Sequence, residues 1–229
     1  MKITASSLIR WAGLSALVAG ICFVVLGLLH PPNVLSSVTT TRWAIVYYLA
    51  IAMSVFGLFG MTGLYARQAE AAGWSGLTGY LLWSLWMTLA LIFNFFEAFV
   101  LPLLATRAPT FAEGILRVVT RSAGEMDFGV LAGLWAVSDI TFVIGGLVFG
   151  IATFRAGVLS RRAAGMLTVG IAVAPAYGLL PDQIESLVAV PIGMGLAWLG
   201  YALWAERREH ASAPVSGRDI PHFRPTAAE

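Results

Sequence analysis

The chain has 229 residues, of which 59% are hydrophobic and only 11% charged, and its mean hydropathy is +0.82. This composition excludes an ordinary soluble domain and predicts an integral membrane protein. The net charge of +2 does not indicate a nucleic-acid partner, because the basic residues stand beside the ends of apolar segments, where the orientation of membrane helices places them.

Six apolar segments are long enough to cross a bilayer, which takes about 20 residues per helix. They predict an all-α, polytopic bundle of six transmembrane helices at 11–30, 43–66, 76–101, 128–154, 162–180 and 185–205. We expect one transmembrane domain over residues 1–205. The polar segment that follows, 206–229, is rich in Pro, Ser and charge and is expected to be a mobile cytoplasmic tail.

The basic residues divide unevenly between the two sides of this bundle. Of the 14 Lys and Arg residues, ten fall on the side that carries both termini. Since Lys and Arg are enriched in cytoplasmic loops, both termini are predicted to be cytoplasmic. The four on the outer side are Arg42, Arg107, Arg117 and Arg121.

The longest outer connection, residues 102–127, contains a short helical pattern. Phe111, Ile115, Val118 and Val119 recur at helical spacing, which predicts an amphipathic helix at the membrane interface over 109–123. Such a helix serves as a lid or an anchor, or as a gate over a site beneath it.

Glycine recurs within the second, fourth and sixth segments. Small residues let helix backbones approach closely in lipid, so these glycines favour packing within the bundle, self-association or assembly with other membrane subunits. They are Gly57, Gly60, Gly63, Gly146, Gly150, Gly193, Gly195 and Gly200.

The layout resembles a family of uncharacterised bacterial six-helix membrane proteins of unassigned function. The resemblance covers most of residues 11–205 and includes the carboxylate in "FNFFEAF" and the turn "FRAGVLSRRAAGML" between the fourth and fifth helices. It implies the fold and a location in the bacterial inner membrane. It implies no catalytic role for any residue.

Familiar catalytic patterns do not fit the sequence. "GWSG" at 73–76 matches the serine string of rhomboid proteases, but no histidine lies in the sixth helix to act as base. The single lysine, Lys2, excludes a retinal Schiff base within the bundle, and His30 alone near a span excludes a bis-histidine haem. We expect no metal and no cofactor, and leave a bound lipid or pigment open.

Polar residues inside the spans are the remaining candidates for a site, because such residues are costly in lipid. Asn94 and Glu97 share a helical face, and Asp139 lies near the middle of the fourth helix. The sequence predicts that these three and their neighbours converge on an outward-facing polar cavity. The candidate ligand or proton site comprises Glu97, Asp139, Asn94, His30, Arg42 and Tyr47.

Three functions follow from these observations. The first is a non-catalytic membrane protein, either a homo-oligomer or an accessory subunit of a larger complex, in which the polar residues hold helices together in contact with membrane lipids. The second is a small proton-linked transporter, or a protein that binds lipid or a small hydrophobic ligand, with Glu97 and Asp139 as its protonatable pair. The third is a membrane-embedded acid–base enzyme that acts on a lipid or isoprenoid.

Overall fold

The computed structural model describes residues 4–122, 124, 126–177 and 186–212, the last seven of these by their backbone alone. The described residues form helices and turns, and no strand occurs among them. The helices follow one another as α1 (Ala5–Leu29), α2 (Leu35–Val38), α3 (Thr41–Phe95), η1 (Phe96–Val100), α4 (Leu101–Arg107), α5 (Pro109–Val119), α6 (Val130–Ala156), α7 (Arg161–Tyr177), η2 (Ser186–Val188) and α9 (Ala189–Ser212).

Helix α3 is a hairpin of two antiparallel halves. The chain reverses at Gly73, whose φ of 55° and ψ of −149° lie outside the helical range. Glycine reaches this conformation without the steric penalty that a Cβ would bring. Across the hairpin the rings of Tyr65 and Tyr80 stack with their centroids 4.9 Å apart. The two halves therefore account for the second and third predicted helices.

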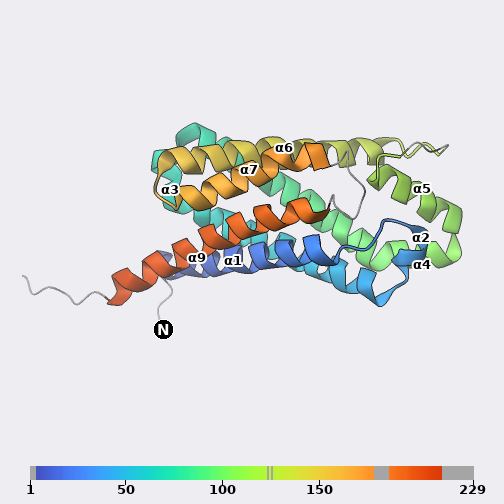
Figure 1. The fold of residues 1–229 in the computed structure, drawn as a ribbon, viewed down its shortest axis with the longest axis horizontal. Helices are drawn as coiled ribbons and strands as arrows, with labels where there is room; N and C mark the ends of the chain where they lie inside the picture. The colour runs from blue at the N-terminus through green and yellow to red at the C-terminus, as the bar shows by residue number, and fades with distance from the viewer. Residues whose placement is uncertain (1–3, 123, 125, 178–185, 213–229) are drawn as a thin grey trace, which may run out of the picture.

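The long helices form an antiparallel bundle (Figure 1). Helix α1 packs between α9 and the first half of α3, the second half of α3 packs against α6, and α7 lies between α6 and α9. The short helices α2, α4 and α5 gather at one end, which we call the α5 end. Helix α1 begins and α9 finishes at the opposite end, which we call the terminal end.

Small residues bring the helix backbones together. A Cβ on Gly20 of α1 would overlap the backbone of Ala197 in α9, and one on Gly60 of α3 would overlap the backbone of Ala16 in α1. The same holds for Gly79 of α3 against Phe149 of α6. Close backbone approach of this kind drives helix association in lipid through van der Waals contact.

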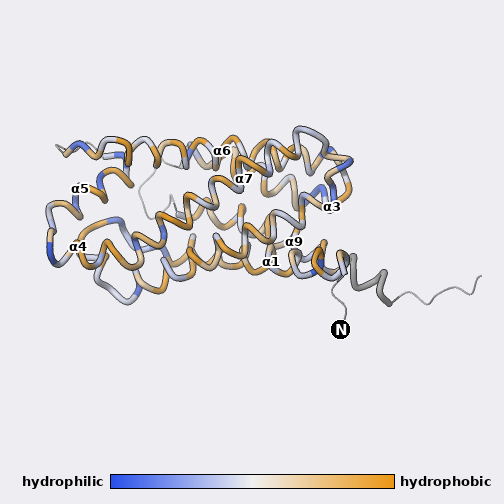
Figure 2. Tube along the Cα trace, turned by 180° about the vertical axis from the view of Figure 1, so that it is seen from behind, coloured by the Kyte–Doolittle hydropathy of each residue, from blue (hydrophilic) through white to orange (hydrophobic). Residues whose placement is uncertain are grey.

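Apolar side chains also cover the outside of the bundle. Figure 2 shows hydrophobic residues along the length of the helices and hydrophilic ones gathered toward the ends. Large side chains such as Phe59, Leu81 and Ile144 are about half exposed. Among the described residues, four helices are long and apolar enough to cross a membrane: Ala5–Leu29, Thr41–Arg107, Val130–Ala156 and Ser186–Ala205. These features indicate a membrane protein.

Several element boundaries and one buried face differ from the sequence predictions. Helix α1 begins at Ala5, where Thr4 and Ser7 cap each other's backbone, and α9 continues to Ser212, within the predicted tail. The rest of that tail, 213–229, lies outside the described residues. The interfacial helix is present as α5, but the side chains that it buries are those of Ala112, Ile115 and Leu116.

The buried face of α5 is rotated because the helix packs against protein. Helix α5 contacts α2, α4 and α6. The side chains that it buries are therefore those that face these helices, and not only those that would face lipid. Phe111, predicted to lie on that face, is 42% exposed, and its ring packs against Phe128, with the ring centroids 5.4 Å apart.

Candidate functional site

Glu97 lies in a local change of helical register. It belongs to the π-helical turn η1, in which the Leu101 N–H bonds to the Phe96 carbonyl instead of the Glu97 carbonyl that it would reach in an α-helix. The next donor for Glu97, in the π register, would be residue 102, which is proline and has no N–H. The sequence thus leaves the Glu97 carbonyl without a donor from its own helix.

Trp43 supplies the missing donor. Its indole Nε1–H donates to the Glu97 backbone oxygen at 2.8 Å, and both groups are buried. Trp43 stands at the start of α3, where the side chain of Thr40 caps the helix by accepting from the Trp43 N–H. The indole therefore joins the first turn of the hairpin to its last. A buried carbonyl must be paired in this way, since an orphaned one costs free energy.

The Glu97 side chain is contacted by Tyr47, which lies one helical turn after Trp43 on α3. The Glu97 carboxyl group faces the Tyr47 side chain, and the two residues are only 5% and 4% exposed. The Tyr47 ring packs between Trp43, at 4.5 Å between centroids, and His30, at 6.0 Å.

Asn94 and Arg42 bond elsewhere than to the Glu97 carboxyl. The Asn94 side-chain amide donates to Ser54 Oγ across the hairpin, at 3.4 Å. Arg42 donates from Nε to the Leu29 carbonyl at 2.9 Å and from Nη2 to the His30 carbonyl at 3.5 Å. It therefore closes the last turn of α1, whose terminal carbonyls lack helical partners. Arg42 and Glu97, which were predicted to belong to one site, do not form an ion pair.

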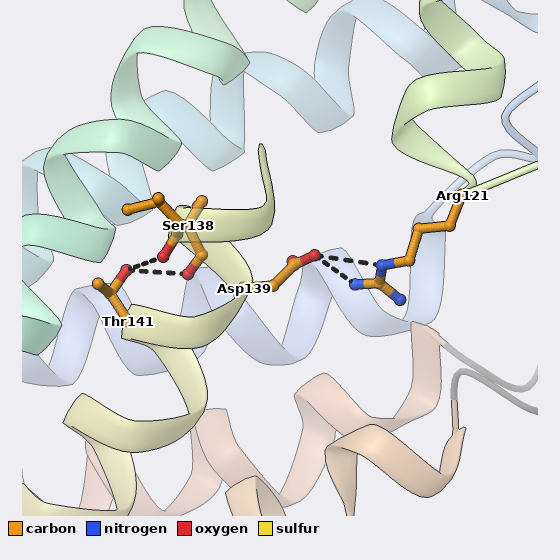
Figure 3. Close-up of polar contacts among 5 residues, drawn as sticks. Arg121, Ser138, Asp139 and Thr141 are labelled. Carbon is orange, nitrogen blue, oxygen red and sulfur yellow. Dashed lines mark hydrogen bonds and ion pairs between the residues drawn. The ribbon is translucent and has the colours of Figure 1, made fainter. Parts of the chain in front are cut away.

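Asp139 pairs with Arg121. The Arg121 Nη2 and Nε donate to Asp139 Oδ2 at 2.7 and 3.2 Å. Figure 3 shows Asp139 pointing from α6 toward Arg121, while its neighbour Ser138 points to the other side of the helix. Asp139 is 45% exposed and Arg121 62%, whereas Ser138 and Thr141 are buried. Asp139 and Glu97 thus have different partners, and the six predicted residues do not converge on one cavity.

The backbone of Arg121 explains how its side chain reaches α6. Helix α5 ends in a Schellman motif, with Ser122 N–H bonded to the Arg117 carbonyl and Arg121 N–H to the Val118 carbonyl. Arg121 occupies the left-handed position of this motif, with φ of 53°, where glycine is usual. The position costs an L-residue about 1 kcal/mol, and the ion pair with Asp139 gives a reason for arginine there.

Three cavities at the α5 end share Arg117 and Ser122, and we call them together the Arg117 hollow. Their volumes are about 710, 350 and 300 Å³. The largest lies beside Glu113, Val118 and Phe128; the second adds Asn33 and Thr120; the third adds Arg121, Trp135 and Asp139. Asp139 therefore faces a cavity, and Glu97 lines none of these three. A further cavity, of about 210 Å³, lies between His30 and Arg42.

Sequence reasoning missed Trp43, because a tryptophan at the end of an apolar segment is usually an anchor at the membrane interface. The signal available was Pro102, five residues after Glu97, which removes a helical donor for the Glu97 carbonyl. Sequence reasoning also missed a buried bond between α3 and α6, in which Gln68 Nε2 donates to Thr153 Oγ1 at 2.8 Å.

Known proteins add no assignment to this geometry. No family model matches the chain, no curated protein matches it, and no solved structure matches its fold. The resemblance to bacterial six-helix proteins therefore stays an expectation. Any function has to be argued from the contacts that this chain makes.

Proposed function

We propose that the chain is a non-catalytic, multi-pass protein of the bacterial inner membrane that acts through association, as an accessory subunit of a membrane assembly or as a homo-oligomer. The observation that carries this proposal is the burial of Glu97 in contacts that join the ends of one hairpin. A buried glutamate whose backbone carbonyl accepts from Trp43 and whose carboxyl faces Tyr47 is placed to hold helices together. Because Asp139 is engaged by Arg121 on another element, a protonatable pair made with Glu97 is not favoured.

The proposed arrangement has six crossings with both termini in the cytoplasm. Helix α3 supplies two of the crossings, and α7 has 17 residues, or about 26 Å at 1.5 Å per residue, against a hydrocarbon core of about 30 Å. The division of the 14 Lys and Arg residues along the sequence, ten on the side of the termini and four on the other, supports the orientation.

The glycines favour the accessory-subunit form over self-association. They were one reason to expect oligomers, yet Gly60, Gly146, Gly150, Gly193, Gly195 and Gly200 all meet neighbouring helices of the same chain. Their close-packing faces are thus occupied within the bundle. A partner would meet the large apolar side chains on the outside.

The proposal predicts a structural coupling between Tyr47 and Glu97. Tyr47→Phe and Glu97→Leu should each lower the free energy of unfolding by about 1–3 kcal/mol, because each leaves a buried polar group unpaired. The double variant should lose less than the sum, with a coupling of about 0.6–1.7 kcal/mol. Unfolding in detergent, followed by circular dichroism, measures all three variants.

Tyr48→Phe is the matched control, since Tyr48 is the next residue along the helix and is 50% exposed. It should unfold like the wild type. Strictly additive effects of Tyr47→Phe and Glu97→Leu would show that the Glu97 carboxyl does not hold the hairpin together. They would favour the alternative in which Glu97 is a protonatable group of a transporter.

A second candidate function is the binding of a lipid or a small amphipathic ligand. The Arg117 hollow favours it, because its largest cavity falls within the range of about 300–1,000 Å³ that is usual for ligand sites. The hollow combines apolar walls with a few charged groups, as such sites do. It lies at one end of the bundle, where the headgroups of the outer leaflet would lie in the proposed orientation.

A further inference from the structure

The charges around the Arg117 hollow are balanced between the two signs. Arg117 and Glu113 are four residues apart on α5, hence on one face of that helix, and both line the 710 and 350 Å³ cavities. The 300 Å³ cavity adds the pair of Arg121 and Asp139. Two guanidinium groups and two carboxylates among the described lining residues suit a ligand that itself carries one charge of each sign.

Each sign of charge has a preferred chemical partner. A guanidinium binds phosphate oxygens through its planar fork of N–H donors. Glu113 is a carboxylate and accepts hydrogen bonds. Asn33 lines the same 350 Å³ cavity as Glu113, and its side-chain oxygen is buried and has no hydrogen-bond partner among the described residues. A carboxylate and an unpaired amide oxygen on two lining residues of one cavity suit a ligand with several N–H donors.

These requirements distinguish among membrane lipids. A primary ammonium carries three donors, whereas a trimethylammonium carries none and an uncharged glycerol headgroup carries no positive charge. The apolar walls of the hollow, Val118 and Phe128 in one cavity and Trp135 in another, provide contact for the glycerol and the first part of the acyl chains.

We propose that the Arg117 hollow binds the headgroup of a phospholipid that carries a primary ammonium beside its phosphate diester, as phosphatidylethanolamine does. The phosphate lies against Arg117, and the ammonium lies between Glu113 and the Asn33 side-chain oxygen. This inference rests on the second candidate function, the binding of an amphipathic ligand, and adds the class of ligand and the residues that select it.

The test uses the delipidated full chain in detergent and native mass spectrometry. Three lipids with the same acyl chains are titrated: phosphatidylethanolamine, phosphatidylcholine and phosphatidylglycerol. The wild type should bind the ethanolamine lipid about tenfold more tightly than either of the others, as expected for hydrogen bonds to a charged group. Glu113→Gln and Asn33→Ala should reduce this preference over the choline lipid, and Arg117→Gln should weaken binding of all three.

Arg107→Gln is the matched control. Arg107 ends α4 at the same end of the bundle and is exposed, and it lines none of the three cavities, so its replacement should change nothing. A thermal unfolding midpoint for each variant separates a loss of binding from a loss of folding. If Arg107→Gln weakens binding as much as Arg117→Gln, the contact is general surface electrostatics and the proposal is wrong.

Two further outcomes would overturn the proposal in distinguishable ways. Equal binding of the three lipids, still lowered by Arg117→Gln, would reject the ammonium site and leave ligand binding at the hollow in place. If none of the three lipids binds, both the ammonium site and ligand binding at the hollow are rejected. Competition by soluble glycerophosphoethanolamine at the same concentration as the lipid would identify a soluble ester as the ligand, whereas its failure to compete would support the membrane lipid.

Discussion

Glu97 shows how a single proline can determine the partner of a residue five positions earlier. Pro102 removes one backbone donor, the π-helical turn diverts another from the Glu97 carbonyl, and Trp43 fills the place. π-Helical turns of this kind are frequent at functional sites. Here the turn binds a tryptophan of the same hairpin, so its role is to close the hairpin at the α5 end.

The bond from the Trp43 indole to the Glu97 carbonyl can be tested by substitution. Trp43→Phe keeps an aromatic ring against Tyr47 and removes the Nε1 donor, so it should lower the free energy of unfolding by about 1–3 kcal/mol. In a Pro102→Ala background the loss should be smaller, because residue 102 then has an N–H for the Glu97 carbonyl. Unfolding in detergent measures both, and Trp74→Phe, at a residue 84% exposed, is the control. An equal loss in the two backgrounds would contradict the explanation.

The sequence singled out Glu97 as a polar residue inside an apolar segment, and the structure shows that it is buried, but the sequence could not identify its partners. A contact between residues 43 and 97 depends on the register of the α3 hairpin, which is set at Gly73. Successive residues on a helix are about 100° apart, so a small error in the turn moves a different side chain to the interface. Arg42 and Tyr47 are one and a half turns apart, and the structure places only Tyr47 against the Glu97 carboxyl.

Helices α1 and α9 illustrate packing at the scale of elements. Gly13, Gly20 and Gly27 recur every seven residues along α1, and Gly200, Gly193 and Ser186 face them in reverse order. A seven-residue repeat keeps one face of a helix toward one neighbour over its length. The glycines of α9 were noted in the sequence. The helix against which they pack could not be predicted, because the matching glycines of α1 were not recognised.

The element-scale prediction compares two glycines within helices. Gly20→Ala should cost about 1–3 kcal/mol in overpacking, because the added methyl meets the backbone of α9. Gly133→Ala should be neutral or stabilising by up to about 1 kcal/mol, since a Cβ there meets nothing within 4 Å. Unfolding midpoints of the two variants in the same detergent make the comparison. Equal effects would show that helix propensity, and not close packing, controls these sites.

The whole bundle separates its basic residues by end. Arg67, Arg155 and Arg161 lie near the terminal end, whereas Arg42 and Arg107 lie at the α5 end, as the positions of their helices show (Figure 1). These five residues, which the sequence divides between the two sides of the membrane, therefore lie at opposite ends of the bundle. The orientation of those ends in a cell stays a prediction, because it depends on the membrane and on insertion.

The prediction at the scale of the molecule tests this orientation. In a Cys22→Ala background, Arg107→Cys should react with a membrane-impermeant maleimide added to intact spheroplasts, and Arg155→Cys should react only after the membrane is opened. Both positions are exposed in the bundle, so neither is protected by packing. Reaction of Arg155→Cys in intact cells would reverse the assignment of the termini.

The reversal at Gly73 also bears on the order in which the protein assembles. The bonds from Trp43 to Glu97, from Asn94 to Ser54, and between Thr62 and Tyr80, and the contact of Tyr47 with Glu97, all lie within residues 41–107. A newly made segment of residues 41–107 can satisfy these polar groups as soon as its two halves meet in the bilayer. The hairpin is therefore suited to leave the insertion machinery as a finished unit, onto which the later helices α6, α7 and α9 dock.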